Sequence, residues 1–172
     1  MKIIKTKFKD LLVIKSKIFH DKRGYFREIS LEKLIKKRLI FTVISKSKKN
    51  VLRGMHFQHK KPQGKYISVL KGEIFDVAVD CRRNSKTFGK HFKIILNDKD
   101  NVSIYIPPGF AHGFVSLKKE NMVLYSCTNY RDIKSESGIA WNDPDLSINW
   151  PIKKPTLSSK DRLNKSFKFY FD

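Results

Sequence analysis

The sequence predicts an all-β protein with a jelly-roll fold (a double-stranded β-helix) and short peripheral helices. Runs rich in β-branched and aromatic residues recur at roughly ten-residue spacing between turn-forming residues, which is typical of an antiparallel sandwich or barrel. The chain has 172 residues, of which 40% are hydrophobic, so one domain with a substantial core can form. We therefore expect a single jelly-roll domain over residues 1–172.

The first expected element is a short helix at 31–38, where the sequence LEKLIKKR places Leu31, Leu34 and Ile35 at helical spacing. Most of the chain that follows is expected to form strands. In order, these are Tyr66–Leu70, Ile74–Asp80, Phe92–Leu96, Val102–Ile106, Gly113–Leu117 and Met122–Thr128. From Trp141 onward, tryptophans and prolines replace the strand pattern, and we expect this segment to pack across the barrel.

The run Ile74–Asp80 is predicted to have two different faces. Because side chains alternate along a strand, Asp76 and Asp80 fall on one face. The residues on the other face are Phe75, Val77 and Val79. We expect such a strand to line a polar barrel interior.

The formal net charge is +21, from 37 basic and 16 acidic residues. Most of the basic residues are lysines spread from Lys2 to Lys168, whereas nucleic-acid-binding proteins cluster their charge and use arginine for bidentate contacts. This distribution indicates a lysine-rich surface and predicts no nucleic-acid partner. An anionic substrate such as a diphosphate would be attracted to a protein of this charge.

Several features predict a cytoplasmic protein. No run of about 18 apolar residues occurs, so we expect no membrane-spanning helix and no membrane partner. Lysines interrupt the stretch Met1–Lys9, which argues against a signal peptide. Cys81 and Cys127 lie in strand-like runs and are expected to be buried and reduced.

Two of the five histidines, His56 and His112, lie among glycines and aromatic residues and are candidates for a functional site. Jelly-roll proteins often hold a metal with a His-x-His pair, a carboxylate and a later histidine. The corresponding stretch here is His56-Phe57-Gln58, and glutamine is a poor ligand for transition metals. We therefore expect no metal site.

A series of short blocks matches a known family pattern over most of the chain. The blocks are Asp21–Glu28, Asn50–Gln58, Gln63–Lys65, Gly72–Asp80, Ser85–Gly89, Ile106–Phe114, Tyr125–Tyr130, Trp141–Pro144, Ile148–Pro151 and Leu157–Asp161. In these blocks the chain resembles the dTDP-4-dehydrorhamnose 3,5-epimerase family, a metal-free branch of the cupin superfamily. The resemblance implies an isomerase that inverts carbon 3, carbon 5 or both of a nucleotide-linked 4-keto-6-deoxy sugar. Such an enzyme converts dTDP-4-dehydro-6-deoxyglucose to dTDP-4-dehydrorhamnose in deoxysugar and polysaccharide biosynthesis.

The resemblance also implies catalytic roles for four side chains. His56 would be the general base, and Asp161 would be the carboxylate that holds its imidazole. Tyr125 would be the acid that returns a proton on the opposite face, and Lys65 would stabilise the enolate oxygen. This set suits the chemistry, because a proton beside a ketone can leave as an enolate forms, and inversion needs a base and an acid on opposite faces. No cofactor is therefore expected.

Other residues would bind the nucleotide sugar, according to the same resemblance. Arg53 would contact the diphosphate. The remaining binding residues in the same subunit would be Gln63, Asp76 and His112, the last two in the sugar pocket. Since the family works as homodimers, Arg23 and Glu28 would reach the nucleotide site of a neighbouring subunit.

The chain departs from the family pattern at two places where the substrate would be recognised. The stretch Phe41–Ser45 lacks a Gln-x-Asn pair that the family usually carries, and Arg131 stands where the family has a stacking tyrosine. Arginine can also stack on a base and adds a charge, so Arg131 remains a candidate for substrate binding. The sequence therefore predicts epimerisation and leaves the nucleobase of the substrate open.

Two alternative functions remain open at this point. One is a nucleotide-sugar 3,4-ketoisomerase on the same scaffold, which the combination of the His56–Asp161 pair with Tyr125 disfavours. The other is a non-catalytic carbohydrate- or nucleic-acid-binding jelly roll, which would have no need for such a pair.

Overall fold

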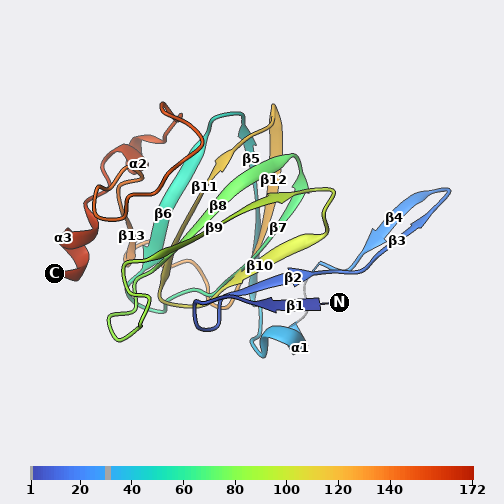
Figure 1. The fold of residues 1–172 in the computed structure, drawn as a ribbon, viewed down its shortest axis with the longest axis horizontal. Coiled ribbons are helices and arrows are strands. Elements are labelled where there is room, and N and C mark those ends of the chain that lie inside the picture. Colours follow the sequence, from blue (N-terminus) through green and yellow to red (C-terminus); the bar gives the residue numbers. More distant parts are fainter. Residues whose placement is uncertain (1, 30–31) are drawn as a thin grey trace.

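Two antiparallel β-sheets face each other in the computed structural model of the protein, which describes residues 2–29 and 32–172 (Figure 1). The first sheet has the order β1 (Lys2–Lys5), β2 (Leu12–Lys15), β10 (Val102–Ile106), β7 (Lys65–Lys71), β12 (Glu120–Cys127) and β5 (Phe41–Lys48). The second has the order β13 (Glu136–Gly138), β6 (Leu52–Gln58), β11 (Phe110–Ser116), β8 (Glu73–Asp80) and β9 (His91–Asn97). This architecture confirms the predicted all-β jelly roll.

The strand β8 separates two apolar clusters, although the sequence analysis expected its face with Asp76 and Asp80 to line a polar interior. One cluster contains Ile74 and Ala78 of β8 with Ile67 and Val69 of the other sheet, so it fills the space between the sheets. The second cluster contains Val77 and Val79. They pack there with residues of the C-terminal segment, namely Leu146, Trp150 and Phe167. The C-terminal segment therefore covers the outer face of the second sheet, as expected from its composition.

The predicted strands of the central region correspond to β7–β12, with bounds that differ by a few residues. The largest difference is in β11, which begins at Phe110 although the prediction began at Gly113. The predicted helix at 31–38 is shorter in the structure, where α1 covers Glu32–Ile35 and Leu31 lies outside the described residues. Lys36 has a φ of 53°, which is incompatible with a continuing right-handed helix and ends α1.

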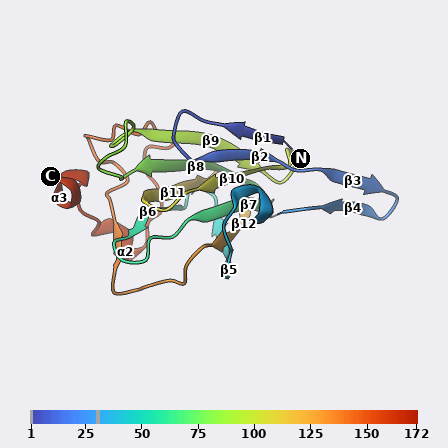
Figure 2. The same cartoon turned by 90° about the horizontal axis from the view of Figure 1, so that it is seen from below.

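A hairpin of β3 (Ile18–Asp21) and β4 (Gly24–Arg27) projects away from the two sheets in both views (Figures 1 and 2). Its side chains Phe19, Tyr25 and Phe26 are more than half exposed. Large aromatic residues that are exposed together on a projecting element are typical of a protein–protein interface.

Two short helices near the C-terminus complete the fold. Helix α2 (Ser159–Arg162) is capped by the side chain of Ser158, and α3 (Phe167–Phe171) is capped by Ser166. Figure 1 shows both helices beside the second sheet, on the opposite side of the molecule from the projecting hairpin. None of the helices in the described residues is long and apolar enough to cross a bilayer. Both cysteines are buried and carry free thiols, as predicted.

Candidate active site

His56 and Asp161 form a hydrogen-bonded pair at the junction of β6 and α2. The Nε2 atom of His56 lies 2.6 Å from Oδ1 of Asp161. Asp161 is buried in the first turn of α2, where its backbone N–H donates to the capping hydroxyl of Ser158. Burial alone would raise the pKa of Asp161, but the hydrogen bond and charge of His56 and the hydrogen bond of Ser158 leave that pKa lowered. Asp161 is therefore an ionised acceptor at neutral pH.

The contact with Asp161 decides which ring nitrogen of His56 can act as a base. An ionised carboxylate accepts hydrogen bonds only, so Nε2 must carry the hydrogen that Asp161 accepts. In the neutral imidazole the lone pair is then on Nδ1. The side chain of His56 is 28% exposed, so part of the ring is open to a substrate.

A pocket of about 400 Å³ opens between the two sheets beside this pair. Its walls come from β5, β7 and β12 of the first sheet and from β6 and β11 of the second. The predicted site residues that line it are Arg53, His56, Gln63, Lys65, His112, Tyr125 and Arg131. The fold therefore brings together residues that are widely separated in the sequence.

Tyr125 faces this pocket from β12, in the sheet opposite to His56. Its hydroxyl lies 3.1 Å from the hydroxyl oxygen of Ser45 on the neighbouring strand β5. The ring also packs edge-on against His112, with 6.2 Å between the ring centroids. Burial raises the pKa of Tyr125, and the hydrogen bond from Ser45 offsets only part of that effect. Tyr125 is therefore protonated at neutral pH.

Lys65, at the start of β7, also lines the pocket. Burial lowers its pKa, while the nearby Cys127, Glu136 and Asp76 act in the opposite direction. Among the residues that the structure describes, no carboxylate lies within 4.0 Å of its ammonium group. The side-chain nitrogen of Lys65 is thus available to contact a ligand.

Asp76 and His112 form a second carboxylate–histidine pair, which is more deeply buried than the first. The Nε2 atom of His112 lies 2.8 Å from Oδ2 of Asp76, and the two side chains are 4% and 0% exposed. His112 lines the pocket, whereas Asp76 lies behind it. Asp76 therefore contributes to the site by fixing the orientation of His112.

The side chains of Arg53 and Gln63 are held in place by hydrogen bonds at the pocket wall. Arg53 donates through Nε to the hydroxyl of Ser47 at 3.0 Å and through Nη2 to the carbonyl of Lys46 at 3.1 Å. Gln63 donates to the carbonyl of Asn129 at 2.8 Å. These contacts order both side chains without neutralising the guanidinium charge of Arg53.

Arg131 is also at the pocket, where its guanidinium contacts a carboxylate that the sequence analysis missed. Its Nη2 and Nε atoms lie 2.7 Å and 3.3 Å from the two oxygens of Glu136. Lys160 contacts the same carboxylate at 2.6 Å. Burial would raise the pKa of Glu136, but these two cations lower it to about 2. Glu136 lies outside the blocks that carry the resemblance, so no signal in the sequence marked it.

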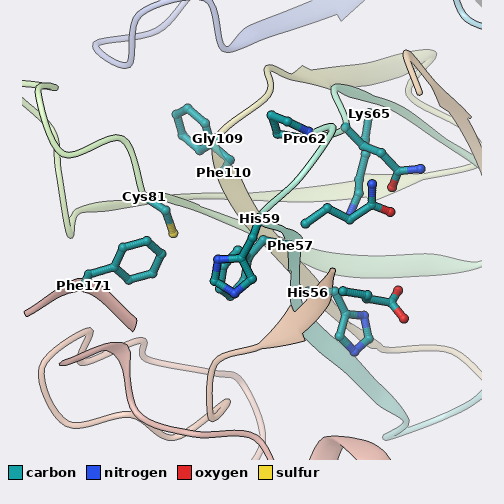
Figure 3. Close-up of a pocket in the computed structure, with 12 residues that line it drawn as sticks. His56, Phe57, His59, Pro62, Lys65, Cys81, Gly109, Phe110 and Phe171 are labelled. Carbon is teal, nitrogen blue, oxygen red and sulfur yellow. The ribbon is translucent and has the colours of Figure 1, made fainter. Parts of the chain in front are cut away.

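A second, smaller cavity of about 200 Å³ shares part of its lining with this pocket. Figure 3 shows His56 and Lys65 on one side of this cavity and Cys81 and Phe171 on the other. The residues shared by both cavities are His56, Gln63, Lys65 and Glu136. The larger pocket contains Tyr125 in addition to His56, so only that pocket offers an acid and a base from opposite sheets.

Four predicted site residues line neither cavity: Asp161 and Asp76, which contact the two histidines, and Arg23 and Glu28, which lie apart from the site. Arg23 is in the turn of the projecting hairpin, where it pairs with Asp21 and its side chain is 85% exposed. Glu28 follows β4 and is exposed. The structure does not bring either residue to the pocket of its own chain.

In the described residues, no group of three or more His, Cys, Asp or Glu side chains could hold a metal ion. The two histidines of the pocket each contact a single carboxylate, and Gln58 directs its amide toward backbone carbonyls. The donor atoms at this site are therefore arranged for hydrogen bonding.

Comparisons with known proteins give a consistent result. A family model described as dTDP-4-dehydrorhamnose 3,5-epimerase matches residues 5–168. The dTDP-4-dehydrorhamnose 3,5-epimerase of Salmonella typhimurium is 45% identical over 169 residues, which cover 94% of this chain and 92% of the relative. That of Methanothermobacter thermautotrophicus is 42% identical over 169 residues, with coverage of 94% and 91%. A similar solved structure is that of dTDP-6-deoxy-D-glucose-3,5-epimerase from Legionella pneumophila in complex with dTDP-4-keto-L-rhamnose. Its TM-score is 0.93 at 41% identity, and the match covers 97% of this chain and 93% of that one.

Proposed function

The chain belongs to the dTDP-4-dehydrorhamnose 3,5-epimerase family, and from this premise we propose that His56 and Tyr125 together invert carbon 3, carbon 5 or both of a nucleotide-linked 4-keto-6-deoxy sugar. Membership makes the protein a sugar-nucleotide epimerase. The observation that carries the proposal is one pocket lined by His56 from one sheet, which is paired with Asp161 of α2, and by Tyr125 from the other sheet. Inversion requires a base and an acid on opposite faces of the reacting carbon, and this arrangement supplies both.

The first step of the proposed mechanism is proton removal by Nδ1 of His56. A carbon–hydrogen bond beside the ketone breaks, and its electrons move toward the carbonyl oxygen to give an enolate. The imidazole becomes an imidazolium, which the ionised Asp161 stabilises through Nε2. Because Asp161 holds the ring at a fixed angle, the base needs no reorientation when the substrate is present.

The enolate oxygen would be stabilised by Lys65. Its ammonium is partly buried and has no carboxylate contact among the described residues, so its charge can meet the negative charge that develops on the oxygen. A charge placed in this way favours the transition state over the ground state, which is what accelerates the step.

The second chemical step would be protonation from the opposite face by Tyr125. Its hydroxyl hydrogen moves to the carbon, the enolate returns to a ketone, and the carbon centre is inverted. The imidazolium of His56 then loses its proton to water, and Tyr125 regains one. No electron transfer occurs, so the reaction as written requires no redox cofactor.

Several charged and polar side chains around this centre would bind the substrate. Arg53 suits the diphosphate, because its guanidinium is ordered by Ser47 and is not paired with a carboxylate in the described part of the chain. His112, oriented by Asp76, and Gln63 would contact the sugar. Arg131 would lie beside the nucleotide.

We also propose that the protein works as a homodimer, with the projecting hairpin as the contact. Phe19, Tyr25 and Phe26 expose apolar surface on this hairpin, and Arg23 lies in its turn. A hairpin that packs on a second copy could place Arg23 and Glu28 at the partner's pocket. Light scattering measures the mass in solution. A monomer at micromolar concentration would contradict this part of the proposal.

The test of the proposed reaction is incubation of the enzyme with dTDP-4-dehydro-6-deoxyglucose in deuterated water. We expect deuterium at carbon 3, carbon 5 or both, with inverted configuration in the product. A 3,4-ketoisomerase would instead move the carbonyl group, and a binding protein would leave the sugar unlabelled. Nuclear magnetic resonance spectroscopy of the product distinguishes these outcomes.

A further inference from the structure

The hydroxyl oxygens of Ser45 and Tyr125 lie 3.1 Å apart and form a hydrogen bond. In the part of the chain that the structure describes, Tyr125 has no other side-chain partner for its hydroxyl. The two residues come from neighbouring strands, β5 and β12, in which Tyr125 is paired with Val43 and Ser45 with Val123. Ser45 is thus the diagonal neighbour of Tyr125 on the pocket side of the sheet, a distance that a long side chain can span. Both residues line the pocket.

The proposed reaction requires that the hydroxyl of Tyr125 is held in a fixed orientation and that its tyrosinate form is stabilised. Both require a neighbouring group. The hydroxyl must point its hydrogen at the substrate carbon, so its oxygen needs a donor that fixes its position. After the transfer it is a buried tyrosinate, which is costly unless it accepts a hydrogen bond. A neighbouring hydroxyl that can both donate and accept meets both demands.

We propose that Ser45 is a positioning residue for the acid, which donates its hydrogen to the oxygen of Tyr125 and passes a proton from water back to the tyrosinate. The inference rests on the proposed role of Tyr125 as the acid. The proton balance is closed: Tyr125 gives one proton to carbon, Ser45 gives one to Tyr125, and Ser45 takes one from water.

The location of Ser45 is suited to this relay. Strand β5 is one of the two edge strands of its sheet, and Ser45 is partly exposed. Next on the same face is Ser47, whose hydroxyl accepts from Arg53. The inner face of β5 therefore carries two hydroxyls, of which one contacts the acid and the other contacts the residue proposed to bind the diphosphate.

The test separates proton removal from proton return. If Tyr125 cannot deliver a proton, the imidazolium of His56 can exchange with solvent and return deuterium to the face from which it removed hydrogen. Ser45→Ala should therefore retain deuterium exchange beside the ketone within about threefold of wild type. Net inversion should fall about ten- to a hundredfold, the range for loss of a hydrogen bond to a charged group. The KM should change by less than about threefold, since Ser45 acts through Tyr125.

Two further variants serve as matched controls. Ser45→Thr keeps the hydroxyl and should restore most of the inversion. Thr42→Ala removes a comparable hydrogen bond between the same two strands. Thr42 lies on the opposite face of β5 from Ser45, and its hydroxyl contacts that of Ser126 on β12 at 3.2 Å. That variant should retain both exchange and inversion, and circular dichroism checks that all variants fold.

Equal losses of exchange and inversion in Ser45→Ala, or no loss of either, would overturn the proposal for Ser45. The role of Tyr125 is tested separately by Tyr125→Phe. If that variant also shows an unchanged ratio of inversion to exchange, the proposed acid is wrong. If Tyr125→Phe loses inversion selectively while Ser45→Ala does not, only the inference about Ser45 fails.

Discussion

The imidazole of His56 and the carboxylate of Asp161 lie 2.6 Å apart although 105 positions separate them in the sequence. His56 belongs to a barrel strand, whereas Asp161 belongs to a short helix of the C-terminal segment. The proposed base, His56, therefore gains its carboxylate partner only when that segment has folded onto the second sheet. Under the proposed mechanism, we therefore expect catalysis to require the docking of the C-terminal segment.

We expect His56→Ala to lower the rate of inversion by about 10²–10⁴-fold, because the group that removes the proton is missing. Asp161→Asn should have a smaller effect, because an amide can still hold the ring but stabilises the imidazolium less. Steady-state kinetics and deuterium exchange beside the ketone measure both effects. Near-normal exchange in folded His56→Ala would refute the assignment of the base.

Tyr125→Phe should impair net inversion more than deuterium exchange. The substitution keeps the ring that packs against His112 and removes only the hydroxyl that would deliver the proton. Parallel measurement of product configuration and deuterium content at the reacting carbon gives the ratio of the two processes. Equal losses would mean that Tyr125 acts before proton removal or has a structural role only.

The central strands could be predicted because their own residues carry the pattern, as in β8, which is rich in β-branched and aromatic residues. The strands of the first fifty residues could not be predicted in this way. Strand β1 reads Lys-Ile-Ile-Lys and is exposed, and β5 mixes lysines and serines. Strands β1 and β5 form because they pair with β2 and β12, respectively. The local sequence does not indicate this pairing.

The residues that line the pocket were predictable to a similar extent. His56, Tyr125 and Lys65 lie in blocks that resemble a family, and the pocket contains all three. Ser45 and Glu136 were missed, because a serine on an edge strand and a glutamate near a loop are common surface residues. Their contacts with Tyr125 and Arg131 depend on strand pairing and on the path of the loop before β13.

Exhaustive chelation should leave the activity unchanged. The donors at the pocket are a histidine paired with Asp161, a second histidine paired with Asp76, and the amide of Gln58, which is a poor ligand for transition metals. Activity is measured after dialysis against a chelator, with added iron, manganese and zinc as separate controls. Loss on chelation and recovery with one of these metals would contradict the proposed mechanism.

Asp80→Asn should destabilise the fold by about 2 kcal/mol at pH 7. The buried carboxylate accepts from Arg82, Ser85 and Thr87, and although burial raises its pKa, these contacts lower it to about 2 from an ordinary value of 3.8. That depression corresponds to about 2 kcal/mol of stability. The contribution is complete above pH 4 and is lost as the pH falls toward 2, because the folded state then binds the proton less readily than the unfolded state.

Urea unfolding of the wild type and of Asp80→Asn at pH 7 and near pH 2 tests this prediction. The difference between the two proteins should narrow at the lower pH. Asp145→Asn is the matched control, because Asp145 pairs with Lys168 at the surface and should contribute less than about 1 kcal/mol. A difference for Asp80→Asn that is the same at both pH values would show that the loss is not electrostatic.

The contact between Arg131 and Glu136 bears on which nucleobase the enzyme prefers. Glu136 binds the edge of the guanidinium through two oxygens, which leaves the flat faces of the group free. The side chain of Arg131 is 52% exposed at the pocket, so a base can reach one of those faces. Phe41 and Val43, in the stretch that lacks the two amides of the family, line the same pocket, and their side chains offer the substrate no hydrogen bonds.

We therefore expect a weaker preference for thymidine nucleotides than is usual in the family. Stacking on a guanidinium favours larger bases, and its strength of about 1 kcal/mol limits the discrimination to several-fold. Calorimetric binding of dTDP, GDP, CDP and UDP to the wild type and to Arg131→Tyr measures the ranking. Glu136→Gln should also weaken the preference for larger bases, because a neutral amide binds the guanidinium of Arg131 less firmly than a carboxylate does. A strong preference for dTDP in the wild type that Arg131→Tyr leaves unchanged would contradict the prediction, since stacking on Arg131 would then contribute nothing to base selection.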